Sequence, residues 1–311
     1  MQILGIDMGG TNLKLGWVAN GEVLATSQVK ALPKSSMLEN LSLCKSESIK
    51  LAQQIGASLN DLQGVGLAFP GLVDSKSNRI HSTPKDKFED AIGVDPEAMV
   101  RELWQCSLAV ENDANMALLG EWQFGVGKEY QNIVQITLGT GIGSSVIMEG
   151  KPLRGTHFQA GCLGGHFTLQ ASGKPCICGN RGCAETLASS WALPGLIRES
   201  EECQESPLRK LPQPGYKEVF EAAQQGDALA LRIRQQSLEV WSAVAINLIH
   251  AYDPELVILS GGIMQSAEEI IPYIQQYVQQ HAWTPWGEVK VVKAHFDQSA
   301  ALLGGYYRFE R

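Results

Sequence analysis

The chain has 311 residues, with 25 basic and 33 acidic side chains and a formal net charge of −8. This length predicts two domains of about 150 residues each. The absence of a long basic run argues against a nucleic-acid partner, and the absence of an apolar stretch of about 18 residues argues against a membrane span. The N-terminus opens on an apolar strand rather than on a basic segment, so we expect a cytoplasmic protein without a signal peptide.

The first third of the chain alternates strand and helix patterns. Apolar runs predict strands at 2–7, 12–18 and 22–29, and Asn20-Gly21 between the last two is a typical hairpin turn. A helical pattern follows at 40–58, with an expected buried face of Leu41, Ile49, Leu51, Ala52 and Ile55. Further patterns predict a strand at 63–69, a helix at 95–105 capped by Asp95, a strand at 107–111 and a helix at 113–124.

A second series of elements begins with strands at 132–138 and 143–148. A segment rich in cysteine and glycine covers 155–183, and 184–285 is mostly helical apart from the strand and glycine turn of DPELVILSGGI. The tail from Ser299 is expected to be helical. Each half opens with a Gly/Thr-rich hairpin turn, which predicts two α/β lobes around a cleft: residues 1–114 with the C-terminal helix 298–311, and residues 115–297 with the cysteine-rich loop.

Three glycine-rich turns each follow a strand, at Asp7–Asn12, Leu138–Gly143 and Leu259–Ile263. Such turns let backbone N–H groups face an anion, and two of them together can hold both ends of a triphosphate. Asp7 is placed to bind Mg²⁺, directly or through water. For one turn alone, an ordinary hairpin is the alternative. The candidate phosphate-binding residues are Asp7, Gly9, Gly10, Thr11, Asn12, Gly139, Thr140, Gly141, Gly261 and Gly262.

A strand that ends in a carboxylate just before a helix is typical of a positioned general base. In the segment Val110–Asn115, Asp113 fits that role, since it could take the proton from an attacking hydroxyl. The alternative is that Asp113 or Asn112 only caps the helix, which both residue types do often.

The cysteines indicate a metal site. Three of the seven, Cys176, Cys178 and Cys183, lie within eight residues, and His166 precedes them. One imidazole and three thiolates match a closed tetrahedral zinc site. The alternative is a set of buried free cysteines.

These segments, in this order, resemble the ROK family (repressors, open reading frames, kinases), and the resemblance covers nearly the whole chain. It implies the two-lobed actin-like ATPase fold, which is ribonuclease H-like, with a mixed sheet flanked by helices in each lobe. It implies a glucokinase-like, ATP-dependent sugar kinase that uses Mg²⁺, with Asp113 as the catalytic base and the C6 hydroxyl as the usual acceptor. Family members also often form homodimers, and they bind structural zinc through the positions of His166, Cys176, Cys178 and Cys183.

The resemblance assigns sugar contacts to Gly71, Asn112, Asp113, His166 and Glu185. Two departures change the expected pocket. Leu163 stands where the family has a sugar-binding glutamate, and Lys85, within Ser82–Lys87, stands where it has an asparagine. Lys85 or Lys87 can supply compensating donors. An unmade hydrogen bond costs about 1–3 kcal/mol, so we expect glucose to be a poor substrate or to bind in a shifted pose.

Three other functions are less consistent with the sequence. A transcription repressor of the family carries an N-terminal helix-turn-helix, for which the six residues before Asp7 leave no room. A catalytically impaired sugar sensor is the main alternative, favoured by Leu163 and opposed by Asp113 and both phosphate turns. An ATPase without a sugar substrate is disfavoured by the cysteine-rich loop.

Overall fold

The structure, a computed structural model, describes residues 1–200, 204–296 and 298–310. It divides into two compact units. Unit 1 comprises residues 1–129, 152–160 and 295–311, and unit 2 comprises residues 130–151 and 161–294. The expected helical region 184–285 includes positions 201–203, and the expected lobe segments end on 297 and 311, all of which lie outside the described residues. Residues 115–129 and 152–160 belong to unit 1 by their contacts, whereas the sequence-based division assigned them to the second lobe.

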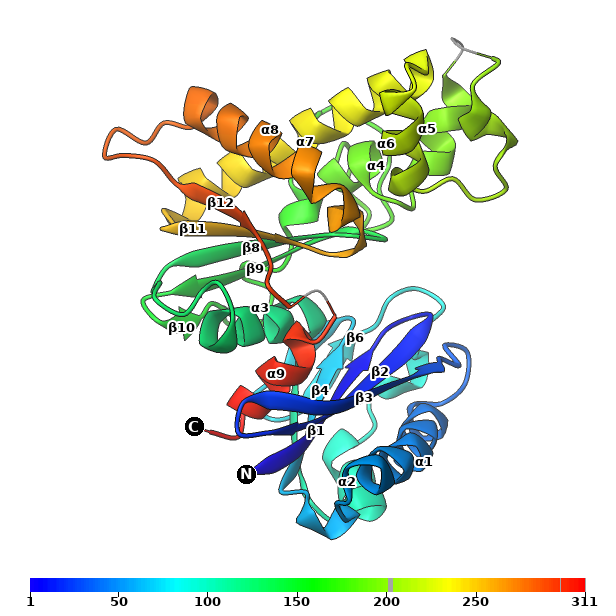
Figure 1. The fold of residues 1–311 in the computed structure, drawn as a ribbon, viewed down its shortest axis with the longest axis vertical. Helices are drawn as coiled ribbons and strands as arrows, with labels where there is room; N and C mark the ends of the chain where they lie inside the picture. The colour runs from blue at the N-terminus through cyan, green and yellow to red at the C-terminus, as the bar shows by residue number, and fades with distance from the viewer. Residues whose placement is uncertain (201–203, 297, 311) are drawn as a thin grey trace. The chain divides into compact units, whose positions relative to one another are not determined.

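Unit 1 is built on a five-stranded mixed sheet (Figure 1) of order β3-β2-β1-β4-β7. The strands are β1 (Gln2–Met8), β2 (Asn12–Ala19), β3 (Glu22–Lys30), β4 (Gly64–Phe69) and β7 (Ser107–Asn112). The first three form the predicted antiparallel meander, and β4 and β7 run parallel to β1. Asn20 and Gly21 both have positive φ, at 52° and 76°, which confirms the predicted tight turn. A separate pair, β5 (Leu72–Asp74) and β6 (Arg79–Ser82), was not predicted.

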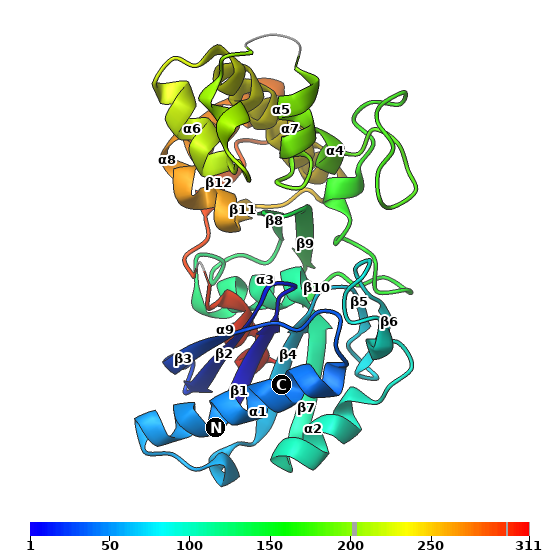
Figure 2. The ribbon, with the colours of Figure 1, turned by 90° about the vertical axis from the view of Figure 1, so that its right-hand side faces the viewer.

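Helices cover both faces of this sheet. On one face lie α1 (Met37–Ile55) and α2 (Pro96–Trp104), and Figure 2 shows α1 crossing the sheet. On the other face lie α3 (Asp113–Phe124) and α9 (Ala300–Tyr307). Asp95 caps α2 as predicted. The predicted extension of α1 to residue 58 is wrong, because Gly56 ends the helix in a left-handed conformation. Ile49 was wrongly expected to be buried, since its side chain points away from the core and is 41% exposed.

Unit 2 contains most of a second five-stranded sheet, of order β10-β9-β8-β11-β12. Its strands are β8 (Ile133–Leu138), β9 (Ile142–Met148), β10 (Lys151–Pro152), β11 (Leu256–Ser260) and β12 (Lys290–Lys293). Strands β8, β11 and β12 are parallel and β9 is antiparallel to β8. The long helices α7 (Ala228–Tyr252) and α8 (Ala267–His281) lie along one face (Figure 1). The predicted class, α/β with a mixed sheet in each half, is confirmed.

Shorter helices complete the two units. The α-helices are α4 (Ala184–Ala188), α5 (Leu193–Glu199) and α6 (Tyr216–Gln224). The 3₁₀ helices are η1 (Leu59–Asp61), η2 (Glu89–Ala91), η3 (Gly164–His166), η4 (Pro207–Lys210) and η5 (Gly262–Ser266).

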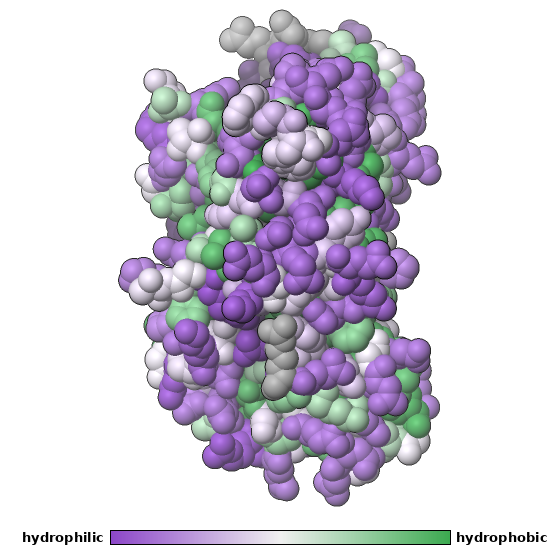
Figure 3. Space-filling view, turned by 90° about the vertical axis from the view of Figure 1, so that its left-hand side faces the viewer, coloured by the Kyte–Doolittle hydropathy of each residue, from purple (hydrophilic) through white to green (hydrophobic). Residues whose placement is uncertain are grey.

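One face of the molecule is largely polar. Hydrophilic residues cover most of the face drawn in Figure 3. Within the described residues, no helix is both long enough and apolar enough to cross a lipid bilayer.

The helix that carries Asp113 is held by an unusually close helix contact. A Cβ added at Gly120 of α3 would lie 2.0 Å from the Ala300 carbonyl oxygen, and one added at Gly304 of α9 would lie 1.9 Å from that of Met116. Gly305 approaches Gly66 of β4 in the same way. Only glycines let these backbones meet, so the C-terminal helix fixes the position of α3 against the sheet.

We therefore expect Gly304→Ala to lower the free energy of unfolding by about 1–3 kcal/mol, because the added methyl group must push α9 away from α3. Urea or thermal denaturation measures the change. The matched control is Gly195→Ala in α5, where the nearest atom to the new methyl is 3.9 Å away. That variant should be neutral or slightly stabilised. Equal stability of the two variants would refute the close-contact argument.

Candidate functional site

The first glycine-rich turn lies between β1 and β2 in unit 1. Asp7 is near the end of β1, and the Gly9 N–H donates to its carbonyl oxygen at 3.1 Å, which closes the turn. A Cβ at Gly9 would lie 2.7 Å from the Asn12 carbonyl oxygen, so the turn requires glycine there. Thr11 is exposed, while Gly10 and Asn12 are half-buried. The turn can thus present backbone and hydroxyl donors to an anion.

Asn112, rather than Asp113, is the N-cap of α3. Its Oδ1 accepts from the N–H groups of Ala114 and Asn115, at 3.1 and 3.2 Å. The Asp113 carboxylate accepts from the Ala114 N–H at 2.8 Å and from the Asn112 amide at 3.0 Å, both at Oδ1. Because both bonds end on Oδ1, Oδ2 is the oxygen that can take up a proton. Of the two residues named in the capping alternative, Asn112 does cap the helix, whereas Asp113 is the first residue of α3.

Asp113 lies near a second carboxylate. Burial, and after it the negative charge of Asp7, raise the pKa of Asp113 to about 6, against the lowering effect of its hydrogen bonds. Burial also raises the pKa of Asp7, while Lys14, its partner across the β1–β2 pair, lowers it. A carboxylate with a pKa near 6 is a much better proton acceptor than an ordinary aspartate and is still ionised at neutral pH.

Glu111 holds the residues next to Asp113 in place through hydrogen bonds. Its carboxylate is 1% exposed and accepts from Arg154 Nε at 3.0 Å and Nη2 at 2.5 Å, while Arg308 Nη1 lies 3.9 Å away. The other oxygen accepts from the Asn112 N–H at 3.1 Å and the Asn115 amide at 3.4 Å. Glu111 thus links two arginines to the residues on either side of Asp113, a positioning role that its sequence did not reveal.

Gly71 joins the same group of residues. Its carbonyl oxygen accepts from the Asn112 amide at 3.0 Å. Its φ is 151°, and an added Cβ would lie 2.2 Å from the Ser82 carbonyl oxygen. Only glycine fits, and the side chain of Asn112 is thereby fixed from both ends. Unit 1 therefore brings together Asp7, Gly9–Asn12, Gly71, Asn112 and Asp113.

The second glycine-rich turn, between β8 and β9 of unit 2, is held by Glu185. This glutamate is buried in α4, and its Oε1 accepts from the Ile142 N–H at 2.8 Å. Its Oε2 accepts from the Trp191 indole at 3.1 Å, and the Trp191 N–H donates in turn to the Thr140 carbonyl oxygen. A Cβ at Gly141 would lie 2.3 Å from Oε1. Both oxygens of Glu185, which was expected to bind sugar, thus accept hydrogen bonds from the turn and from Trp191. No local pattern predicts this contact.

The third turn lies beside the second. Gly261 has a φ of 98°, and a Cβ there would lie 2.3 Å from the Leu138 carbonyl oxygen, at the end of β8. Thr137 and Ser260, which pair at the ends of β8 and β11, share a hydrogen bond of 3.1 Å. Unit 2 therefore brings Gly139–Gly141 and Gly261-Gly262 to the same edge of its sheet.

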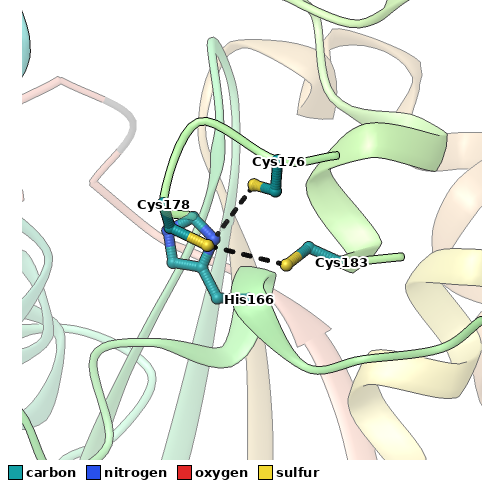
Figure 4. Close-up of side chains that lie close together, drawn as sticks. All are labelled: His166, Cys176, Cys178 and Cys183. Atoms are coloured by element: carbon teal, nitrogen blue, oxygen red, sulfur yellow. Dashed lines mark hydrogen bonds between the residues drawn. The ribbon is translucent and has the colours of Figure 1, made fainter. Parts of the chain in front are cut away.

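The predicted metal ligands converge in unit 2 (Figure 4). The ligand atoms of His166, Cys176, Cys178 and Cys183 lie within 4.8 Å of one another. His166 Nδ1 is 3.6 Å from Cys176 Sγ, and the sulfurs of Cys178 and Cys183 are 3.7 Å apart. Tetrahedral zinc with bonds of about 2.3 Å to sulfur and about 2.1 Å to nitrogen gives edges of about 3.8 and 3.6 Å. The four side chains therefore fit a zinc ion in both chemistry and spacing.

The metal cluster is attached to the second turn. Cys183 is the N-cap residue of α4, two positions before Glu185. On the other side, Gly165 precedes His166, and a Cβ there would lie 1.9 Å from the Ile142 carbonyl oxygen. Both ends of the cysteine-rich loop thus contact Ile142, one at its N–H and one at its C=O. An ion that fixes the loop would also fix the turn.

Comparisons with known proteins agree with this geometry. The family model described as "ROK family" matches residues 3–311. The chain is 31% identical to a glucokinase of Thermotoga maritima, over 98% of this chain and 96% of that protein. A ROK hexokinase from Thermus thermophilus is 26% identical, with a TM-score of 0.78 over 100% and 99% of the two chains. A ROK family glucokinase from Streptomyces griseus, solved with glucose and AMPPNP, is 27% identical, with a TM-score of 0.80 over 98% of each. The predicted actin-like ATPase fold is confirmed.

We predict that Arg154→Met lowers the free energy of unfolding by about 3 kcal/mol, because it leaves the buried Glu111 charge with a single, more distant arginine. Chemical denaturation at pH 7 measures the loss. Arg101→Met is the matched control, since it breaks an exposed pair with Glu97 one helical turn away. Its effect should stay within about 0.5 kcal/mol. A loss for Arg154→Met no larger than that of the control would contradict the supporting role of Glu111.

Proposed function

The chain belongs to the ROK family, and on that premise we propose that it is an ATP-dependent kinase of a hexose or a related sugar. The observation that carries the proposal is the Asp113 carboxylate, held at the start of α3 with its pKa raised to about 6. A general base poised near neutral pH is what the removal of a proton from a sugar hydroxyl requires. The similarity to sugar kinases along nearly the whole chain supports it.

The proposed reaction is a direct transfer. The hydroxyl oxygen of the sugar, C6 in most kinases of the family, forms a bond to the γ-phosphorus of ATP. The bond between that phosphorus and the β–γ bridging oxygen breaks, and ADP leaves with the electron pair. The hydroxyl proton passes to Asp113 Oδ2. Asn112 and Glu111 keep that carboxylate in place through the hydrogen bonds described above.

We propose that the glycine-rich turns bind the nucleotide. Gly9, Gly10, Thr11 and Asn12 would hold phosphate in unit 1, and Gly139, Thr140, Gly141, Gly261 and Gly262 in unit 2. Their tight backbones leave N–H groups, rather than side chains, to face the anion. Asp7 fits a Mg²⁺ ligand, because it is a half-buried carboxylate beside the first turn; the ion would neutralise phosphate charge.

Sugar recognition is proposed for Gly71 and Asn112 beside Asp113. The sugar-binding roles that the resemblance gives to His166 and Glu185 stay predictions, as do the homodimer and the cytoplasmic location. Leu163 is 44% exposed and offers no acceptor at the place of the family's glutamate. The prediction that glucose is a poor substrate follows from that difference.

An ADP-release assay over a panel of hexoses, amino sugars and ketoses tests the function. We expect one of these sugars to give ATP-dependent turnover far above the sugar-free rate, with a phosphorylated sugar as the product. No turnover with any sugar would favour the impaired sensor instead. Glucose at the top of the panel, with a micromolar KM, would show that the loss of the glutamate does not matter.

Asp113→Asn is the matched variant for this assay. It should lower kcat on the preferred sugar by about 10²–10⁴-fold, because the amide cannot accept the hydroxyl proton. Binding of ATP should change little. The substitution is nearly isosteric, so the fold is expected to survive. A variant that keeps most of its kcat would remove Asp113 from the role of base.

We also propose that the cysteine-rich loop holds one structural zinc ion per chain. Metal analysis of protein purified without chelator should find it, and Cys178→Ser should lower both the zinc content and the melting temperature. Cys106→Ser, outside the cluster, is the control and should leave the zinc content unchanged. Full stability and full activity after complete zinc removal would contradict the structural role.

A further inference from the structure

The segment Pro84–Phe88, which joins β6 to η2, has an unusual backbone. Asp86 and Phe88 have φ values of 60° and 52°, in the left-handed region that bulky residues rarely adopt. Phe88 is nonetheless fully buried, with its ring 5.9 Å from that of Phe69 and its N–H bonded to the Pro33 carbonyl oxygen. The Asp86 N–H is held by the Glu89 carboxylate. These contacts hold Asp86 and Phe88 in a backbone conformation that a free chain rarely adopts. The backbone of Lys87, which lies between them, is therefore fixed on both sides.

The Lys87 side chain lies against the first glycine-rich turn. A Cβ built at Gly10 would lie 2.5 Å from Lys87 Nζ, 2.9 Å from Cδ and 3.0 Å from Cε. The ammonium group thus reaches the backbone of the turn that follows Asp7. Among the described residues, no carboxylate forms an ion pair with Lys87, and the cation that acts on Asp7 is Lys14. The half-buried charge of Lys87 faces the turn without an anionic partner of its own.

We propose that Lys87 binds the terminal phosphoryl group of the nucleotide at the Gly9–Thr11 turn and stabilises it during transfer. The proposal rests on the proposed function, which gives this turn its phosphate. A lysine is a compact point charge that suits phosphate oxygens, and the turn supplies N–H donors beside it. Ser82, the last residue of β6 and two positions before this segment, packs its carbonyl oxygen on Gly71. The backbone that carries Lys87 is thus linked to Gly71, where the sugar is expected, while the Lys87 ammonium group lies at the Gly9–Thr11 turn.

The role in the reaction is electrostatic. As the sugar oxygen bonds to the γ-phosphorus and the bond to the bridging oxygen breaks, negative charge stays on the three peripheral oxygens of the transferred group. Lys87 donates hydrogen bonds to one of them and transfers no proton. ADP lacks this group, so Lys87 distinguishes ATP from ADP.

Lys87→Met tests the proposal, because it keeps the length of the side chain and removes its charge. We expect kcat/KM for ATP to fall about 10²-fold. Binding of the ATP analogue AMPPNP, measured by calorimetry with Mg²⁺, should weaken about tenfold or more, whereas binding of ADP should change less than twofold. Lys87→Arg should recover part of both losses. Lys76→Met, an exposed lysine in the β5–β6 turn, is the control and should behave as the wild type.

Each other outcome overturns the assignment. If the binding of AMPPNP and of ADP weakens equally, the substitution acts on the structure of the turn and not on the γ-phosphoryl group. The melting temperature of Lys87→Met is measured as a control, and an unchanged value excludes misfolding as the cause. A rise in the sugar KM with unchanged AMPPNP binding would make Lys87 a sugar ligand. Wild-type behaviour of Lys87→Met would remove any role. If no sugar is phosphorylated by the wild type, the proposed function fails, but the AMPPNP and ADP measurements still decide whether Lys87 binds the γ-phosphoryl group.

Discussion

The repulsion between two carboxylates, Asp7 and Asp113, is the interaction on which the site in unit 1 depends. Each is delivered by the end of a strand, β1 or β7, and the parallel order β1-β4-β7 puts both ends at the same edge of the sheet. Two half-buried negative charges at one edge of a sheet are unfavourable, and burial together with the charge of Asp7 raises the pKa of Asp113. Cations bound there would relieve the repulsion, which is why an Mg²⁺–nucleotide complex suits this edge.

The surrounding structure keeps these groups in place through a buried ion pair and a close contact between two helices. Glu111, a third carboxylate, is buried two residues before Asp113 and is stabilised by Arg154 and Arg308. The glycine contacts between α3 and α9 then hold the helix itself. The position of the Asp113 carboxylate therefore depends on three distant parts of the chain, around residues 111, 154 and 304.

In unit 2, a glycine-rich turn is held in place by residues next to the predicted metal ligands. The Gly139–Gly141 turn is held by Glu185 and Gly165 at the two polar groups of Ile142. Both residues flank ligands of the Cys₃His cluster. A metal ion bound to that cluster would thus act on the Gly139–Gly141 turn through two short connections, each only one or two residues long.

Much of the fold could be predicted from the sequence. Strong local signals were correct: the Asn20-Gly21 turn, the Asp95 cap, the boundaries of α3 and the spacing of the four metal ligands. Short strands such as β12, with four residues and lysines at both ends, carry too little periodicity to be found. The contacts of Arg154 with Glu111, Trp191 with Glu185 and Lys87 with Gly10 join residues six to 77 positions apart, and no local pattern reports such pairs.

The pH dependence of kcat/KM, measured with the preferred sugar and ATP–Mg²⁺ both far below their KM values, reports the protonation of Asp113 in the free enzyme. Asp113 must be ionised to accept a proton, and its raised pKa means that it becomes protonated as the pH falls through about 6. We expect kcat/KM to be constant near neutral pH and to fall tenfold per pH unit below an apparent pKa of about 6. A profile that stays flat down to about pH 4, where an ordinary aspartate titrates, would contradict the claim that Asp113 is a base whose pKa is raised.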